Sequence, residues 1–344
     1  GVTSSGLGAR SVAVLPAGCR RERSDWLAQI AGEVIATPGG ESNVKEIFDK
    51  THELRQEPDC MIFNQFEEMG NHLWHYQVTG SAVAEGFEAV KRPGDRLSGA
   101  CFTSGSAGTI GCGDYLKEVY PGLKLAVGEA LQCPTILENG FGDHRIEGIG
   151  DKHIPWIHNV KNTDMVIDID DEDSQRLLRL FNDPAGHDYL REAGVPEKTL
   201  SQLSLLGISG IANVLCCVKL SKYYELTEHD VVATVLTDSA DMYRSRIQEL
   251  ADQYGPYDGR AAAVDHALHL RGLRTDAMAE LNYYDRKRVH NLKYYTWVEQ
   301  QGRDMHELNN LWYGSTWDDV HRQAAALDEL ITAFNEETGV LKRL

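Results

Sequence analysis

Residues 102–111 read FTSGSAGTIG, a turn of small residues between an apolar stretch and a helix-like one. Small residues let successive backbone N–H groups point at one spot, and the N-terminus of a following helix adds a partial positive charge there. The turn therefore predicts an anion site, most simply one for a phosphate. A tight strand-to-helix turn that needs small residues only for packing is the alternative, and it is favoured for a single isolated turn.

Other motifs built on small residues fit this turn less well. No Gly-Lys-Ser/Thr follows it, which excludes a nucleotide P-loop. GxGxxG with an acidic residue at the right distance is absent, so a dinucleotide-binding fold has little support. GxSxG is also absent, which removes the simplest hydrolase interpretation.

The segments around the turn alternate between strand-like and helix-like patterns. Short apolar runs bounded by Pro or Gly indicate buried strands, and apolar residues at helical spacing indicate helices. This alternation predicts a parallel sheet with right-handed crossovers. The last expected strand has the composition of one buried on both faces, and only helices are expected from about Met242 onward. The expected strands are 11–16, 32–40, 60–66, Leu97–Phe102, Lys124–Ala130 and Val231–Asp238, and the expected helices include 21–31, 43–57, Thr109–Val119 and Leu215–Tyr224.

Composition narrows the function classes. The 344 residues suggest about two domains, and the formal net charge of −18 argues against a nucleic-acid partner. No apolar run is long enough for a membrane span, and residues 1–16 lack the pattern of a signal peptide, so a cytoplasmic protein is expected. The seven cysteines form no CxxC pair, which favours reduced, partly buried thiols and no zinc site. The acidic run 168–174 is expected to be a solvated turn before a helix at 175–181, and no calcium loop.

Five segments in order carry a resemblance to a known family. They are NQFEEMGNHLWHYQVTG (64–80), the turn with its helix and following strand (104–130), HRIEGIGDKHIP (144–155), LGISGIANV (206–214) and VVATVLTDSADMY (231–243). Together they resemble the fold-type II pyridoxal phosphate (PLP) enzymes of the cysteine synthase and cystathionine β-synthase group. The resemblance implies a two-domain α/β fold like that of tryptophan synthase β, with parallel sheets flanked by helices. The helical C-terminal extension departs from the plain synthases, and it is not the regulatory domain pair that cystathionine β-synthases can carry.

The resemblance also implies roles for individual residues. The family's Gly-Thr-Gly-Gly-Thr loop binds the 5′-phosphate of PLP, and Gly105, Ser106, Ala107, Gly108 and Thr109 stand in its places. A neutral hydroxyl meets the pyridine nitrogen in this family, and Ser239 matches that position. Asp238 competes for this role in the same turn, and Ser239 could also act as a helix N-cap. The implied substrate-side residues are Gln65, Gly148, Ile149 and Gly150.

The catalytic lysine of the family is not found among these residues. In the family it forms a Schiff base with PLP and lies ahead of a Ser-Gly-Asn turn, whereas residues 1–16 resemble the stretch after that turn. Either an upstream segment is absent from this chain or the protein is a non-catalytic relative, and the first is expected because every later part is kept. None of the other lysines considered matches the family position: Lys45, Lys50, Lys219 and Lys222.

The resulting expectation is a smaller, N-terminally incomplete domain (1–80), a larger PLP-binding domain (81–243) and a helical extension (244–344). The expected reaction is β-replacement or β-elimination on a serine-like amino acid, with O-acetylserine or serine plus a thiol, in a homodimer. A PLP-dependent serine/threonine dehydratase or ammonia lyase, and a non-catalytic binding or regulatory protein, are the alternatives. Aromatic residues of the extension are expected in the core or a dimer contact, less so in a lid, with Val289, Leu292, Tyr295 and Val298 at core-like spacing. His290 and His306 are expected to be ordinary surface or core residues.

Overall fold

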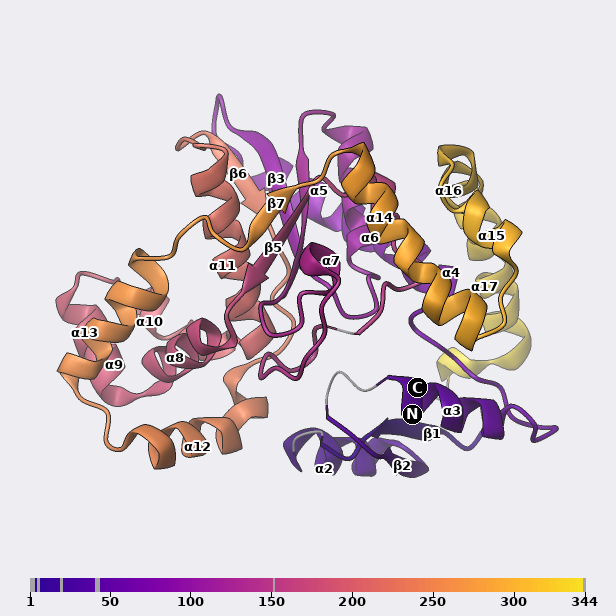
Figure 1. The fold of residues 1–344 in the computed structure, drawn as a ribbon, viewed down its shortest axis with the longest axis horizontal. Coiled ribbons are helices and arrows are strands. Elements are labelled where there is room, and N and C mark those ends of the chain that lie inside the picture. Colours follow the sequence, from indigo (N-terminus) through magenta and orange to yellow (C-terminus); the bar gives the residue numbers. More distant parts are fainter. Residues whose placement is uncertain (1–3, 5–6, 19–20, 41–43, 151, 343–344) are drawn as a thin grey trace.

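The main sheet has five strands in the order β6-β3-β4-β5-β7 (Figure 1). The structure is a computed structural model, and it describes residues 4, 7–18, 21–40, 44–150 and 152–342. Four neighbouring strands run parallel, as the alternating pattern predicted, and the last pairs antiparallel at one edge. The bounds are β3 (Arg96–Thr103), β4 (Lys124–Ala130), β5 (Met165–Ile169), β6 (Asp230–Ala233) and β7 (Met278–Glu280).

Helices cover both faces of this sheet. Alternate residues of a strand point to opposite faces, so Ala100 and Phe102 join one apolar cluster while Cys101 joins the other. The first cluster includes residues of α5 (Gly80–Val90), α6 (Ile110–Val119) and α14 (Tyr283–Lys293). The second includes residues of α8 (Asp171–Asn182) and α11 (Ile208–Tyr223). Short elements complete this part: α4 (Met69–Trp74), η1 (His75–Thr79), α7 (Thr135–Glu138), η2 (Val160–Asn162), α9 (Pro184–Glu192), α10 (Glu197–Leu200), η3 (Leu203–Leu205) and η4 (Ala240–Tyr243).

A second, smaller sheet lies below the main one in Figure 1. It pairs β1 (Val12–Pro16) with β2 (Glu33–Thr37) in parallel, joined by α2 (Arg21–Ile30) and followed by α3 (Lys45–Leu54). The third strand expected here, at 60–66, is wrong. Its chain folds into a turn in which the side chain of Asn64 accepts from the amide of Phe66, and Phe66 is buried against Phe48.

Two expectations about the main sheet are also corrected. The strand expected at Val231–Asp238 ends at Ala233 as β6, and it is half-buried because it occupies the sheet edge. The acidic run at 168–174 is no solvated turn. Asp168 lies in β5 and is only 1% exposed, and Asp170 caps helix α8 by accepting from the amide of Glu172. The run is partly buried because it ends β5 and begins α8, which starts at Asp171 and not at the expected residue 175.

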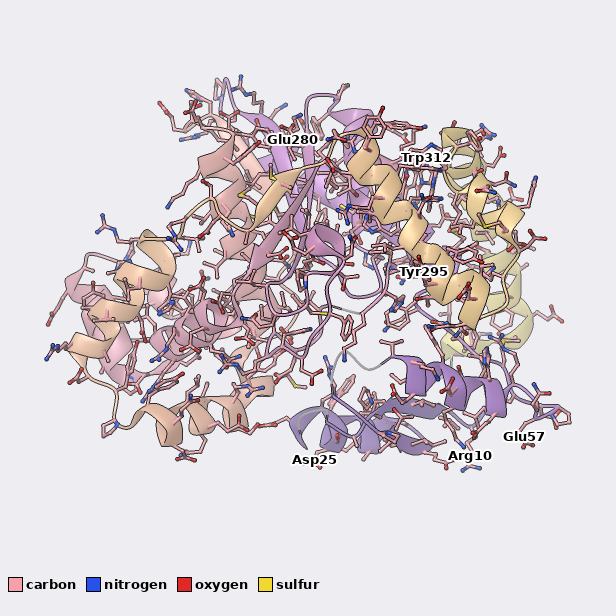
Figure 2. All side chains as sticks on the ribbon, viewed as in Figure 1. Arg10, Asp25, Glu57, Glu280, Tyr295 and Trp312 are labelled. Atoms are coloured by element: carbon pink, nitrogen blue, oxygen red, sulfur yellow. The ribbon has the colours of Figure 1, made fainter. Side chains whose placement is uncertain are left out.

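The C-terminal extension is helical except for β7, which corrects the expectation of helices alone. β7 pairs with the edge of β5, where backbone N–H and C=O groups would otherwise lack partners in the sheet. Trp297, Trp312 and Trp317 are buried, whereas Tyr295 is 60% exposed although its spacing suggested the core (Figure 2). The remaining helices are α12 (Arg244–Tyr254), α13 (Gly259–Asp265), η5 (His266–Arg271), η6 (Tyr294–Gln300), α15 (Met305–Asn310), α16 (Gly314–His321), α17 (Ala324–Thr338) and η7 (Val340–Lys342). None of the helices described has the length and apolar character needed to cross a bilayer.

Candidate active site

The glycine-rich turn leaves β3 and enters helix α6 (Figure 1). Ala107 has a φ of 65°, in the left-handed region, and Thr109 is right-handed. Alternation of this kind makes a concave nest of N–H groups. Among the described residues, no atom accepts a hydrogen bond from the amides of Gly105–Thr109. The turn therefore presents unused donors at the N-terminus of a helix of 10 residues, which suits an anion.

Packing also explains part of the turn. A Cβ on Gly108 would overlap the side-chain amide of Asn71 and lie 2.9 Å from Cδ2 of His75. A Cβ on Gly105 would lie 3.2 Å from the carbonyl oxygen of Gly148. Asn71 Nδ2 donates to the Gln65 carbonyl at 2.9 Å and to the Ser106 hydroxyl at 3.1 Å. Asn71 thus fastens the 64–80 segment to the turn.

The segment at 144–150 contacts the turn directly. The amide of Gly150 donates to the Ser104 carbonyl at 2.6 Å. Gly148 and Gly150 have φ values of 87° and 72°, which other residues rarely adopt, so glycine is required at both. The structure therefore brings the expected phosphate loop and the expected substrate-side turn together, with Ile149 buried between the two glycines.

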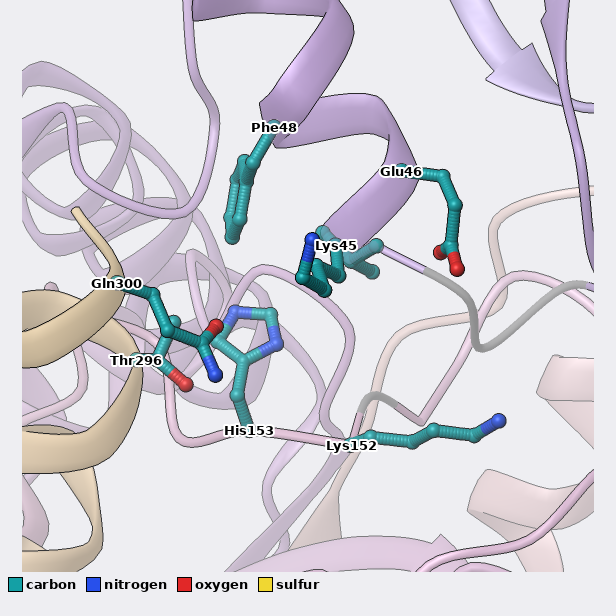
Figure 3. Close-up of a pocket in the computed structure, with 8 residues that line it drawn as sticks. Lys45, Glu46, Phe48, Lys152, His153, Thr296 and Gln300 are labelled. Carbon is teal, nitrogen blue, oxygen red and sulfur yellow. The ribbon is translucent and has the colours of Figure 1, made fainter.

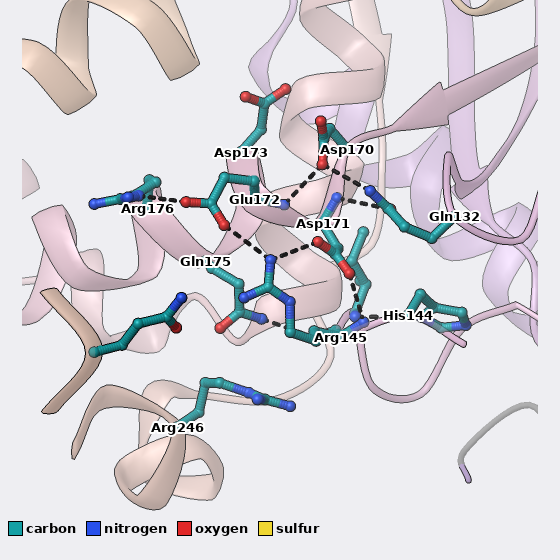
Figure 4. Close-up of polar contacts among 12 residues, drawn as sticks. Gln132, His144, Arg145, Asp170, Asp171, Glu172, Asp173, Gln175, Arg176 and Arg246 are labelled. Carbon is teal, nitrogen blue, oxygen red and sulfur yellow. Dashed lines mark hydrogen bonds and ion pairs between the residues drawn. The ribbon is translucent and has the colours of Figure 1, made fainter. Parts of the chain in front are cut away.

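Arg145 fixes this segment to the start of α8 (Figure 4). Its guanidinium donates to Asp171 at 2.7 Å and to Glu172 at 2.8 Å, and its amide also donates to Asp171. The hydrogen bond to Asp171 is the main reason that the pKa of Arg145 is raised. Gln175 Nε2 donates to the carbonyl of Arg145 at 2.8 Å. The acidic run that was expected to be a solvated turn therefore anchors the segment that contains the expected substrate-side residues.

Asp238 and Ser239 follow β6 at the same end of the sheet. Asp238 Oδ2 accepts from the hydroxyl of Tyr243 at 2.5 Å, and its carbonyl accepts from the amide of Gly207 at 2.9 Å. Burial and the nearby Asp238 carboxylate raise the pKa of Tyr243. The Ser239 hydroxyl forms no hydrogen bond with any described residue and does not cap η4 through its side chain. Both competing groups keep an atom that no described residue hydrogen-bonds, the Ser239 hydroxyl and the buried Oδ1 of Asp238, so the choice between them stays a prediction.

Asn213 of α11 links this loop to the end of β3. Its Oδ1 accepts from the amide of Thr103 and its Nδ2 donates to the carbonyl of Val235, each at 2.8 Å. Ligands of open α/β sheets bind outside the carboxyl ends of the strands. The glycine-rich turn follows the carboxyl end of β3, and the loop with Ser239 follows that of β6. The residues present fit a group with a phosphate at the turn and a ring that meets a neutral hydroxyl.

Comparison with known proteins gives one consistent result, although no family model matches the chain. A probable cysteine synthase of Bacillus subtilis (strain 168) is 27% identical over 246 residues, or 71% of this chain and 72% of that protein. The chain is similar to the cysteine synthases. The structure of an O-acetylserine dependent cystathionine β-synthase from Helicobacter pylori is 25% identical, with a TM-score of 0.55 over 70% of this chain and 71% of that one. A hydrogen sulfide-producing enzyme from Fusobacterium nucleatum shares the fold at 22% identity, with a TM-score of 0.59 over 77% of this chain and 72% of that one.

The four lysines that were compared with the catalytic lysine of the cysteine synthases each bind a partner outside the candidate site. Lys45 pairs with Asp49, whose hydrogen bond raises the pKa of the lysine, and Lys50 pairs with Glu53. Lys219 donates to the carbonyl of Asp168. Lys222 donates to the carbonyls of Arg271 and Leu273. None of them contacts the turn or the Ser239 loop by a hydrogen bond.

A cavity of about 280 Å³ lies between α3, η6 and the chain after Gly150 (Figure 3). Lys45, Lys152 and His153 line it, together with Thr296 and Gln300. Burial lowers the pKa of His153 to about 3, so this ring is neutral. Polar side chains of α3 and of η6 thus meet at this cavity, next to the chain that follows Gly150.

Proposed function

We propose that this protein is a PLP-dependent enzyme that carries out β-replacement on a serine-like amino acid, with O-acetylserine or serine plus a thiol. The observation that carries the proposal is the run of amides at Gly105–Thr109, at the start of α6, from which no described residue accepts a hydrogen bond. The names of the relatives support the reaction class, because they are cysteine synthases and an O-acetylserine dependent cystathionine β-synthase. The homodimer and the cytoplasmic location stay predictions.

Each part of the site has a role in this proposal. The amides of Gly105–Thr109 bind the phosphate, and the hydroxyls of Ser106 and Thr109 add donors. Ser239 meets the pyridine nitrogen as a neutral partner and so does not drive its protonation. When bound, PLP supplies an electron sink for the charge that develops at Cα of the substrate.

The substrate-side groups orient the amino acid. Gly148, Ile149 and Gly150 form a wall beside the turn, and Gln65 is tied to the turn because Asn71 donates to both its carbonyl and the Ser106 hydroxyl. Arg145 keeps that wall in place from outside. No described residue is assigned to the covalent attachment of PLP or to the movement of the α-proton.

The decisive experiment separates the phosphate contact from the rest of the site. PLP and pyridoxal, which lacks the phosphate, are titrated into the full-length protein and binding is followed by cofactor absorbance. We expect pyridoxal to bind at least tenfold more weakly, and Ser106→Asp to abolish this preference because a carboxylate enters the nest. Ser201→Asp adds the same charge at an exposed serine and should bind PLP as the wild type does.

Activity is measured on the same proteins with O-acetylserine and a thiol, by mass spectrometry of the thioether product. We expect product from the wild type and from Ser201→Asp, and none from Ser106→Asp. Equal affinity for PLP and pyridoxal would refute the phosphate site. Tight, phosphate-dependent binding without any amino-acid product would refute the reaction and leave the binding site standing.

A further inference from the structure

Two histidines and an aspartate from distant parts of the chain meet away from the turn. His72 belongs to α4, Asp114 to α6 and His321 to α16 of the extension. The Nε2 atoms of the two histidines are 3.0 Å apart. Asp114 Oδ2 lies 3.7 Å from Nε2 of His72 and 4.0 Å from Nε2 of His321. The three ligand-type atoms thus form a closed triangle.

The size of this triangle matches the coordination sphere of a transition metal. For edges of 3.0, 3.7 and 4.0 Å, the point equidistant from the three atoms lies about 2.1 Å from each. Zinc in proteins sits about 2.0–2.2 Å from imidazole nitrogen and carboxylate oxygen. We propose that His72, Asp114 and His321 bind a zinc ion, which fastens the C-terminal extension to α6. This proposal does not depend on the proposed function.

The chemistry of the ligands selects the class of metal. Imidazole nitrogen suits zinc and similar divalent ions, whereas calcium and magnesium prefer an all-oxygen set. The side chains of His72 and Asp114 are 1% and 3% exposed, and that of His321 is 10% exposed. Among the described residues, no lysine or arginine forms an ion pair with the buried Asp114, so a bound cation would supply the missing positive charge.

Groups around the triangle hold its members in position. Asp114 accepts from Asn159 Nδ2 at 2.7 Å and from Asn162 Nδ2 at 2.6 Å. Nδ1 of His321 lies 3.8 Å from a carboxylate oxygen of Glu118. Metal-bound histidine commonly has a carboxylate behind its second ring nitrogen.

Aromatic rings fix the planes of the two imidazoles. Tyr76 stacks on His321 with centroids 3.7 Å apart, and Trp317 packs on His72 at 4.9 Å. The rings of His72 and His321 are nearly parallel, at 6°. Both histidines are therefore oriented before any ion arrives, which lowers the conformational cost of binding.

The competing explanation is a hydrogen bond between two neutral imidazoles, without an ion. It accounts for the 3.0 Å separation of the nitrogens. It does not account for the approach of Asp114 Oδ2 to both of these nitrogens, because only one N–H lies between the rings. The two explanations differ in whether the protein contains metal.

The test is metal content and affinity in the full-length protein. We expect about one zinc per chain by mass spectrometry after purification without chelator, and a fall in the melting temperature on chelation that zinc, but not calcium, reverses. His321→Gln and Asp114→Asn should weaken zinc binding at least tenfold by calorimetry. His306→Gln, at an exposed histidine on α15, should leave it unchanged.

X-ray absorption of the zinc-loaded wild type tests the ligands directly, and it does not require that the variants fold. We expect the scattering pattern of two imidazoles at the zinc edge. Failure of the chelated wild type to bind zinc would overturn the site and leave the shared hydrogen bond. So would a zinc spectrum without imidazole ligands, or equal affinity in Asp114→Asn and the wild type when both are folded.

Discussion

Glu129 and Asp168 lie directly opposite each other on β4 and β5, in the middle of the main sheet. They are 3% and 1% exposed. Glu129 accepts from the amides of Ile136 and Leu137, which start the turn of α7. Burial raises the pKa of Glu129 to about 7, and burial followed by the charge of Glu129 raises the pKa of Asp168 to about 9. At neutral pH the pair therefore keeps at least one proton.

This pair predicts that the protein loses stability as the pH rises. A carboxyl group whose pKa is higher in the folded state binds its proton more tightly there. Its contribution to the free energy of unfolding is complete below about pH 4 and is lost as the pH rises through about 7 to 9. Asp168→Asn keeps the shape and removes one acid. We expect it to flatten the fall of the melting temperature between pH 6 and 9. Glu57→Gln, at an exposed carboxylate (Figure 2), should retain the wild-type profile, and an unchanged profile in Asp168→Asn would contradict the prediction.

At the scale of elements, helix α6 connects the two proposed sites. It begins directly after Thr109, and Asp114 lies about one turn further along. Gly113 faces Leu125 of β4 so closely that a Cβ on this glycine would overlap the leucine side chain. Leu125 is fully buried, so it cannot move aside at little cost. The distance between α6 and the sheet is therefore set by the absence of a side chain at this residue.

Gly113→Ala should destabilise the protein by about 1–3 kcal/mol, the usual range for overpacking. A glycine-to-alanine change at an unobstructed helical position has the opposite sign, about 0.5–1 kcal/mol in favour of the folded state. Gly86→Ala in α5 provides that control, because no atom lies within 4 Å of the added Cβ. Urea unfolding of the two variants measures the difference. Equal stability in both would show that α6 has room to shift.

At the scale of the whole molecule, a third apolar cluster joins the smaller sheet unit to the C-terminal extension. Phe48 of α3 packs on Trp297 of η6 with ring centroids 5.7 Å apart. Trp297 is fully buried and donates to the carbonyl of Ile154 at 2.8 Å. Arg303 adds an ion pair with Glu67. The extension thus acts as a structural connection between parts of the molecule that the main sheet does not join.

Trp297→Ala should cost about 3–5 kcal/mol, as large-to-small changes of buried aromatic residues do. Hydrogen exchange should rise in α3 and in η6 together, because each element loses the same contact. Trp26→Ala removes a tryptophan that is 52% exposed and should change stability by less than about 1 kcal/mol. Faster exchange in η6 alone would mean that the two parts are not coupled through this residue.

Of the main sheet, the sequence by itself predicted β3, β4 and the start of β6, together with the phosphate-type turn, but neither β5 nor β7. Lys124–Ala130 is a strand with the predicted bounds, and the helix predicted at Thr109–Val119 begins one residue later. These features are local, because they depend on apolar periodicity and on small residues before a helix. The relation to the cysteine synthases was also visible in the five ordered segments. The placing of PLP, Ser239 and the substrate-side residues stays a prediction.

Tertiary structure alone decided which elements pair and which distant side chains meet. Residues 60–66 have the composition of a strand but bury Phe66 in another cluster, whereas Met278–Glu280 form a strand because β5 has a free edge. Asn71, His72 and Asp114 lie in segments that carry the family resemblance, but nothing in those segments predicted the contact of Asn71 with Ser106 or the triangle with His321. Local patterns report hydrophobicity and turn chemistry. Contacts between residues as far apart as 72 and 321 depend on how the elements pack, and no short stretch of sequence contains that information.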